Sequence, residues 1–388
     1  MKPLLPPVTV ASLVVVLLAA CAPAAPTAPA APGAAGAAPA AKPAARQQAS
    51  RAASTTDYFA GKTVTLLVNY SPGGPTDTFA RLLAQQMDRH IPGRPTLIVE
   101  NKAGAGGLIG KNQLYNASKK DGLTMGVFTS VFGHQLVGGD GVQYDSAGFQ
   151  WLGGITETSI SFANTDLGMR SMRDLLNVTD EIVAGGLAPD TAKDMSIRTS
   201  LNLLGLKYKY VTGYPGSSDA RLAMQRGEVN YYEDSLVSWF SGFAPMAKEG
   251  VLIPLAQRGI PKNGQIVRDP RVADIPTYNE VAVDVRGESV KQSVEYRAMT
   301  TITLLSGISI VGLYPPGVDP ALVEVMRQAI TETFADPEFQ AMVDKQLGYQ
   351  LQETTGAEAQ ELAEQIMRDA REDQEALDYL RRLSREKQ

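Results

Sequence analysis

The feature that most constrains the fold is a repeated order of strand, glycine-rich loop and helix. A β-rich run at 63–70 leads into the loop Ser71–Asp77, after which apolar residues recur at helical spacing. A second strand at 96–100 leads into the loop Gly104–Gly107 and a helix at 108–117. Because strands that are joined through helices usually pair in parallel, this order predicts an α/β fold with a mostly parallel sheet.

The middle third of the chain repeats the pattern and predicts a second lobe. Short strands at 182–184 and 207–211 flank a helix at 190–204. We therefore expect two α/β lobes, each with a mostly parallel sheet, and a ligand cleft between them. The expected division is 57–163 for the first part of lobe 1, 164–256 for lobe 2, and 257–388 for the return to lobe 1. That return ends in a charged helical stretch at 357–385.

The first 56 residues have the composition of a leader and a tether. An apolar run of 13 residues at 8–20 is shorter than the ~20 that a membrane-spanning helix needs, and it predicts a signal peptide over 1–20. It ends in Leu18-Ala19-Ala20-Cys21, which is typical of a lipoprotein cleavage site; the alternative is a plain signal peptide that contains a cysteine. Of the 32 residues at 22–53, 17 are Ala and 6 are Pro, so we expect an extended tether over 21–56 behind a lipidated Cys21.

The composition disfavours several classes of function. The net charge of −5 supplies no basic surface in bulk for nucleic acid. Cys21 is the single cysteine, so neither an internal disulfide nor a cysteine zinc site can form. With only His90 and His134, a hydrolase or metalloenzyme is disfavoured, although carboxylate chemistry stays open. We predict no catalytic residue, no metal and no cofactor.

The two glycine-rich loops leave three interpretations open. The loop at 104–110 is similar to a dinucleotide fingerprint, but Ile109 stands where that motif has Gly or Ala, and neither loop has the Lys-Ser/Thr pair of an ATPase loop. The loops are therefore either tight turns that need positive φ, or anion sites at helix N-termini. Asp77 either begins its helix or accepts a hydrogen bond from a ligand. His134 either lines the cleft or packs within the fold.

The loops also predict how an anion would be held. None of the segments 71–78, 104–107, 129–133 and 185–192 contains Lys or Arg. We therefore expect backbone N–H groups, hydroxyls of the Ser and Thr residues in these segments, and ordered water to bind the anion.

Several motifs in order carry a family resemblance. Tyr70–Asp77, Ala80-Arg81, Val99–Gly110 and Asp121–Thr124 together resemble the extracytoplasmic receptors of tripartite tricarboxylate transporters, the Bug family. Weaker matches continue through 213–216, 226–229, 274–277 and 314–318. The resemblance implies a two-lobed, periplasmic-binding-protein-like (Venus flytrap) fold. It also implies closure over a small organic anion, typically a carboxylate, and delivery to a two-subunit membrane permease.

The candidate ligand-binding residues come from five loops, and Cys21 is the candidate lipidation site. They are Ser71, Gly73, Gly74, Thr76, Asp77, Gly104, Gly106, Gly107, Thr129, Ser130, Gly186, Asp190, Thr191, Gly216 and Ser217. Where the family usually has a small-residue run followed by histidine, this chain has Gly185–Thr191 without one. Asp190 there would repel a second carboxylate or bind an amine.

The expected function is that of a lipid-anchored, exported solute receptor that faces the periplasm or the cell exterior. We expect a monomer that binds a small organic carboxylate and no nucleic acid. Two alternatives remain at this point: a ligand sensor that acts on a membrane kinase, and an exported enzyme that acts on carboxylates, which lacks a recognisable nucleophile–base pair.

Overall fold

The computed structural model describes residues 58–262, 265–305 and 307–386. The predicted signal peptide, Cys21 and the tether lie outside the described residues. Within the described part, no helix combines the length and the apolar character needed to cross a membrane.

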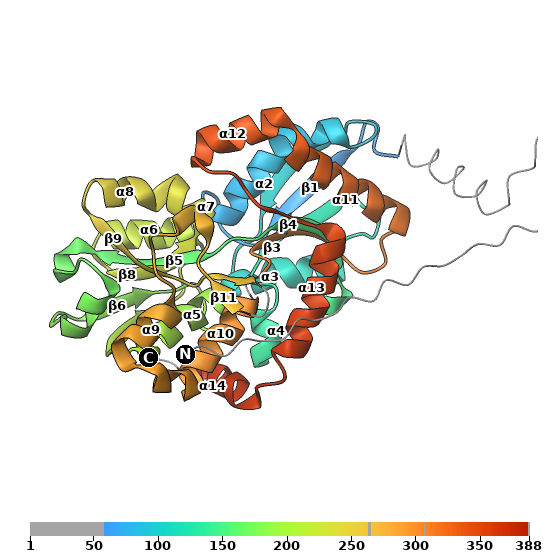
Figure 1. Ribbon diagram of the computed structural model, residues 1–388. Helices are drawn as coiled ribbons and strands as arrows, with labels where there is room; N and C mark the ends of the chain where they lie inside the picture. The colour runs from blue at the N-terminus through green and yellow to red at the C-terminus, as the bar shows by residue number, and fades with distance from the viewer. Residues whose placement is uncertain (1–57, 263–264, 306, 387–388) are drawn as a thin grey trace, which may run out of the picture. The chain divides into compact units, whose positions relative to one another are not determined.

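The first lobe is built on a six-stranded sheet in the order β13-β4-β12-β3-β1-β2. Figure 1 labels β1, β3 and β4 of this sheet. Strands β1, β2, β3 and β4 run in one direction, and β12 and β13 run against them. Their bounds are β1 Thr63–Val68, β2 Thr96–Asn101, β3 Thr124–Thr129, β4 Gln150–Ile155, β12 Ile310–Tyr314 and β13 Glu353–Thr355. The expectation of a mostly parallel sheet is confirmed for this lobe.

Helices cover this sheet with their apolar faces, and further helices of the lobe pack on those helices. In α2 (Pro75–Gln86), Phe79, Leu82 and Leu83 are buried, as the helical spacing in the sequence predicts. The other helices of the lobe are α3 (Leu108–Asn112), continued by a π-helical turn at Gln113–Ala117, α4 (Gly133–Val137), α11 (Pro320–Ala335), α12 (Pro337–Leu347) and α13 (Gly356–Asp369).

The second lobe is built on a five-stranded sheet in the order β7-β6-β8-β5-β9. Among its described strands, β5 alone runs against the other four. The bounds are β5 Ser159–Asn164, β6 Ile182–Gly185, β7 Tyr208–Val211, β8 Tyr231–Ser235 and β9 Leu252–Gln257. Its helices are α5 (Ala192–Leu203), α6 (Ser217–Gln225), α7 (Leu236–Ser238) and α8 (Ala244–Lys248), with a π-helical turn at Trp239–Phe243.

The chain crosses between the two sheets twice. The first crossing, Thr156–Thr158, joins β4 to β5, so sheet membership puts β5 with the second lobe, ahead of the sequence-based boundary at residue 163. The return runs from β9 to β12 through the hairpin β10 (Ile260–Lys262) and β11 (Gln265–Val267), then α9 (Tyr278–Arg286) and α10 (Val294–Leu305). Both crossings border the site described below.

The C-terminal stretch forms two helices, where the sequence suggested one helical run. The break lies between α13 and α14 (Gln374–Arg385), where Asp373 caps α14 by accepting a hydrogen bond from Ala376 N. Helix α14 packs on α10, α4 and α5, so it contacts both lobes. Leu380 of α14 is fully buried in a cluster with Met195 of α5 and Val137 of α4. The amphipathic spacing predicted the helices, but it could not tell which lobe they would cover.

Candidate functional site

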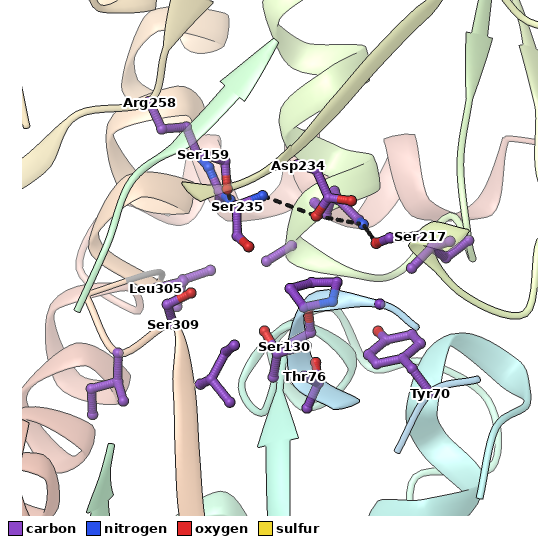
Figure 2. A pocket seen from close by; sticks show the side chains of 18 residues that line it. Tyr70, Thr76, Ser130, Ser159, Ser217, Asp234, Ser235, Arg258, Leu305 and Ser309 are labelled. Carbon is purple, nitrogen blue, oxygen red and sulfur yellow. Dashed lines mark hydrogen bonds and ion pairs between the residues drawn. The ribbon is translucent and has the colours of Figure 1, made fainter. Parts of the chain in front are cut away.

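A cavity lies between the two lobes, where loops from both sheets meet (Figure 2). Its volume of about 60 Å³ is several times the ~10–15 Å³ that one water molecule needs, so a small molecule fits. The first lobe and the crossings contribute Tyr70, Gly74, Pro75, Thr76, Thr129, Ser130, Leu305, Ile308, Ser309 and Ile310. The second lobe and the residue that follows β9 contribute Ser159, Leu187, Ala192, Lys193, Ser217, Asp234, Ser235 and Arg258.

The cavity brings together five of the fifteen candidate residues that the sequence indicated. These are Gly74, Thr76, Thr129, Ser130 and Ser217. The other ten are absent from the cavity lining, and their contact with a ligand stays a prediction.

Three helices begin at the cavity wall. Pro75 is the first residue of α2, Ala192 the first of α5 and Ser217 the first of α6, and all three line the cavity. Helix N-termini carry free N–H groups and a partial positive charge, so their convergence favours an anion.

The hydroxyl of Thr76 points to the same conclusion. This side chain is 1% exposed and lines the cavity, yet its Oγ1 has no hydrogen-bond partner among the described residues. An unpaired buried hydroxyl costs stability, on the order of 1–3 kcal/mol. A ligand or a water molecule in the cavity would satisfy it.

A cation lines the cavity in addition to the uncharged groups that the sequence predicted. Lys193 lines the cavity, one residue beyond the segment that the sequence analysis considered. Its Nζ lies 3.0 Å from Ser217 Oγ, 2.9 Å from Tyr232 OH and 3.4 Å from Asp234 Oδ1. Its position in the first turn of α5 holds it at the helix N-terminus, and only the three-dimensional structure brings it beside Ser217.

Two further charged side chains at the site come from strand ends without a recognisable motif. Asp234 lies in β8, near its carboxyl end. Arg258 directly follows β9, and its Nε lies 3.0 Å from Oε1 of the fully buried Glu233. The Arg258 guanidinium also donates to Ser159 Oγ. Parallel strands present their carboxyl ends at one edge, and this rule was the one signal that pointed to these positions.

Asp77 holds the first loop together. It is 3% exposed and accepts hydrogen bonds from Gly73 N at 2.9 Å, Arg81 Nε at 2.9 Å and Asn101 Nδ2 at 3.0 Å. Burial would raise the pKa of Asp77, but these hydrogen bonds outweigh it and hold the pKa below its usual value. The carboxylate is absent from the cavity lining.

The rim of the cavity is closed by direct contacts between the lobes. Ser71 Oγ donates to Asp219 Oδ2 at 2.7 Å, and Ser218 Oγ donates to the carbonyl of Pro72 at 2.9 Å. Gly216 lies against Ser71 and has no space for a side chain, because a Cβ on Gly216 would lie 2.3 Å from Ser71 Oγ. These contacts place the lobes in a closed arrangement.

The second glycine loop touches the opposite lobe. Gly104, Gly106 and Gly107 all have positive φ, which favours the tight-turn interpretation. A Cβ on Gly106 would lie 2.7 Å from both Ala188 Cβ and Thr191 Cγ2 of the second lobe. Gly106 therefore permits the close approach of the lobes.

The second-lobe loop at 186–191 is held by a buried carboxylate. Thr191 caps α5 by accepting a hydrogen bond from Asp194 N, and Tyr210 donates to Asp194 Oδ1. Gly186 leaves room for that pair, because a Cβ there would overlap Asp194 Oδ1. Asp190 lies outside the cavity lining, with Oδ1 3.5 Å from His134 Nε2.

Behind Ser130 lies a buried cation. Lys111 is 0% exposed, and its Nζ lies 2.7 Å from the Ser130 carbonyl and 2.9 Å from His134 Nδ1. Burial lowers the pKa of Lys111 to about 7. Burial and then the Lys111 charge hold the pKa of His134 well below its usual range. Lys111 and His134 thus anchor the Ser130 loop from behind, which agrees with a packing role for His134.

This burial predicts a pH-dependent stability. The unfolded chain keeps the Lys111 proton up to about pH 10.5 and the folded chain up to about pH 7. Between these values the unfolded state binds more protons, so stability rises with pH by up to ~1.4 kcal/mol per unit from this group. We expect the unfolding free energy of the wild type, relative to Lys111→Met, to rise from pH 7 to 10 in urea titrations. The same comparison with Lys119→Met, which replaces an exposed lysine, should show no such slope. If the difference in unfolding free energy between the wild type and Lys111→Met does not change with pH, the lowered pKa of Lys111 is refuted.

Comparison with known proteins gives relatives of one kind. No family model matches the chain. A UPF0065 protein of Pseudomonas sp. (strain P51) is 24% identical over 253 residues, which are 61% of this chain and 68% of the relative. BugT of Bordetella pertussis is 36% identical over 74 residues, 19% of this chain and 22% of BugT.

Solved structures share the fold. The periplasmic binding protein BugD aligns over 84% of this chain and 99% of its own, with a TM-score of 0.64 and 21% identity. MatC from Rhodopseudomonas palustris with bound malate aligns over 83% and 99%, with a TM-score of 0.60 and 19% identity. A second R. palustris protein, solved with adipate, aligns over 83% and 97%, with a TM-score of 0.62 and 17% identity.

These likenesses confirm the two-lobed, periplasmic-binding-protein-like fold. The chain is thus similar in sequence to a UPF0065 protein and to BugT, and in fold to BugD, in agreement with the resemblance to the Bug-family receptors that the motifs carry.

Proposed function

We propose that the protein is an extracytoplasmic receptor that closes its two lobes over a small organic carboxylate. The observation that carries this proposal is the cavity at which three helix N-termini, an unpaired buried threonine hydroxyl and Lys193 meet. Each of these features favours an anion, and they come from both lobes.

The first lobe would bind the carboxylate through uncharged donors. The N-terminus of α2 and the residues Thr76, Thr129 and Ser130 line the cavity, and Figure 2 shows Thr76 and Ser130 on its lower side. From the other side, the N-termini of α5 and α6 add their partial charges near Lys193 and Ser217. A ligand that contacts both walls stabilises the closed arrangement over the open one, so binding and closure are coupled.

The ligands of proteins with the same fold support this class. MatC was solved with malate and a second R. palustris protein with adipate, and both ligands are carboxylates. At such low sequence identity the likeness supports the fold alone, so the ligand of this chain has to be measured.

We further propose that the receptor is exported and held at a membrane. The apolar run and Leu18-Ala19-Ala20-Cys21 support lipidation of Cys21, and the Ala/Pro-rich segment would let the folded body reach a two-subunit permease. The proposed assembly is a monomer that delivers its ligand to that permease.

Binding without catalysis is the better proposal for this cavity. It contains five serine hydroxyls, yet neither His90 nor His134 is among its lining residues, so none of them has a histidine base there. Over the described residues, no group of His, Cys, Asp and Glu is placed to hold a metal ion.

The unpaired hydroxyl gives a direct test of ligand binding. Thr76→Val keeps the shape of the side chain and removes the donor, so carboxylate affinity should fall by ~0.5–1.5 kcal/mol while stability is unchanged or higher. The measurement is calorimetric titration with mono-, di- and tricarboxylates, beside urea unfolding.

Thr333→Val is the matched control for this test. Thr333 is fully buried, and its hydroxyl donates to the Ala329 carbonyl, away from the cavity. This variant should lose stability and keep affinity. Unchanged affinity of Thr76→Val for every carboxylate that the wild type binds would remove Thr76 from the site.

Closure has its own test at Gly106. In Gly106→Val the new side chain would meet Ala188 and Thr191 only when the lobes are closed, so we expect at least a tenfold loss of affinity in a folded protein. The control is Gly168→Val, at φ +72° with open space around it, which brings a similar backbone strain without the contact. Equal affinities of the two variants would contradict the role of Gly106 in closure.

A further inference from the structure

On the second-lobe wall of the cavity, the donors of Lys193 are all occupied, whereas Asp234 keeps a free acceptor position. Lys193 directs its ammonium at Ser217 Oγ, Tyr232 OH and Asp234 Oδ1, with separations of 3.0, 2.9 and 3.4 Å. An ammonium has three donors, so these described partners occupy all of them. Lys193 therefore adds charge to the site but has no donor left for a ligand in this arrangement.

Asp234, in contrast, has a hydrogen-bonding position that no described residue fills. Its Oδ1 accepts from Ser235 N at 2.9 Å and from Lys193 (Figure 2). Its Oδ2 accepts from Ser238 Oγ at 3.0 Å. A carboxylate has about four acceptor positions, so these three bonds leave one. The side chain is only 3% exposed and lines the cavity, so the partner for that position must come from inside.

The charges of this wall balance each other. Lys193 is paired with Asp234, and Arg258 is paired with the buried Glu233, whose Oε1 lies 3.0 Å from the Arg258 Nε. Ser196 and Tyr278 donate to the other oxygen of Glu233 at 2.7 and 2.9 Å, which keeps that carboxylate in place. Two cations and two carboxylates leave no net positive charge for a second anionic group of a ligand.

The first-lobe wall has a different character. Its lining residues Tyr70, Gly74, Pro75, Thr76, Thr129 and Ser130 are all uncharged, and they include the hydroxyls and the α2 N-terminus that suit one carboxylate. The first-lobe wall therefore offers donors without charge, whereas the second-lobe wall offers a free acceptor position at Asp234 beside the N-termini of α5 and α6.

We propose that Asp234 determines specificity: it accepts a hydrogen bond from the end of the ligand that lies away from the carboxylate. The ligand class is then a monocarboxylate whose other end carries a hydrogen-bond donor, an amide, hydroxyl or ammonium group. A second carboxylate at that end is disfavoured, because it would bring like charge against Asp234 and has no hydrogen to donate to the free acceptor position of Asp234. This inference rests on the proposed function as a carboxylate receptor.

The test compares ligands of equal length that differ only at the far end. Succinate, succinamate, 4-hydroxybutyrate and 4-aminobutyrate form one series, and the corresponding five- and six-carbon compounds form two more. Calorimetric titration of the full chain should show at least tenfold tighter binding of a donor-bearing compound than of the dicarboxylate of the same length. The amide, hydroxyl and ammonium arms identify the donor.

Asp234→Asn should reduce this preference at least tenfold, because the amide offers a donor to the dicarboxylate and removes the like charge. Asp180→Asn makes the same change of charge on an exposed aspartate outside the cavity lining and is the matched control; it should keep the preference. Lys193→Gln is a second variant in case Asp234→Asn does not fold. It leaves Asp234 without its cation and should strengthen the preference against dicarboxylates.

The outcomes separate the two proposals. Dicarboxylates that bind as tightly as their donor-bearing partners, or a preference that Asp234→Asn leaves unchanged, would overturn the role of Asp234 and leave the carboxylate receptor standing. If no compound with a carboxylate binds at any length, the proposed function fails, and this inference fails with it.

Discussion

The close approach of the two lobes is the constraint on which the site depends. Gly106 meets Ala188 and Thr191 with no space for a side chain, and Ser71 donates to Asp219 across the rim. These contacts enclose the ends of three helices in a small volume, where partial charges act with little screening by water. A cavity with the same residues but open to solvent would bind an anion more weakly.

Buried charges around the cavity are held in pairs or networks, and this pairing sets what the site can accept. Lys193 with Asp234 and Arg258 with Glu233 lie in the second-lobe wall, while Lys111 lies behind Ser130 with His134 as its neighbour. Removing one member of a buried pair leaves an uncompensated charge, which is more costly than replacing both. The second-lobe wall is therefore rigid in its charge arrangement, and ligand selection depends on which hydrogen-bonding positions remain unused.

The sequence predicted the parts of the fold and the site that local rules govern. Strands β1 and β2 and helix α2 follow from residue preferences and hydrophobic spacing, and the glycine loops follow from their position before helices. Strands β4 and β5 received no prediction. Strand β4 is buried along nearly its whole length and shows no alternation of apolar and polar residues, whereas β5 alternates only over Ser159–Phe162 and is buried on both faces. Lys193 and Asp234 were missed because their meeting depends on the packing of α5 against β8, which no local pattern contains.

The central claim is that the lobes close over a carboxylate, and small-angle scattering tests it most directly. The protein would be freed of bound ligand by unfolding and refolding, then measured alone and with a saturating amount of the carboxylate that binds most tightly in calorimetry. The account predicts a smaller radius of gyration with ligand, since the open lobes close upon it. An unchanged scattering profile at saturation would contradict it.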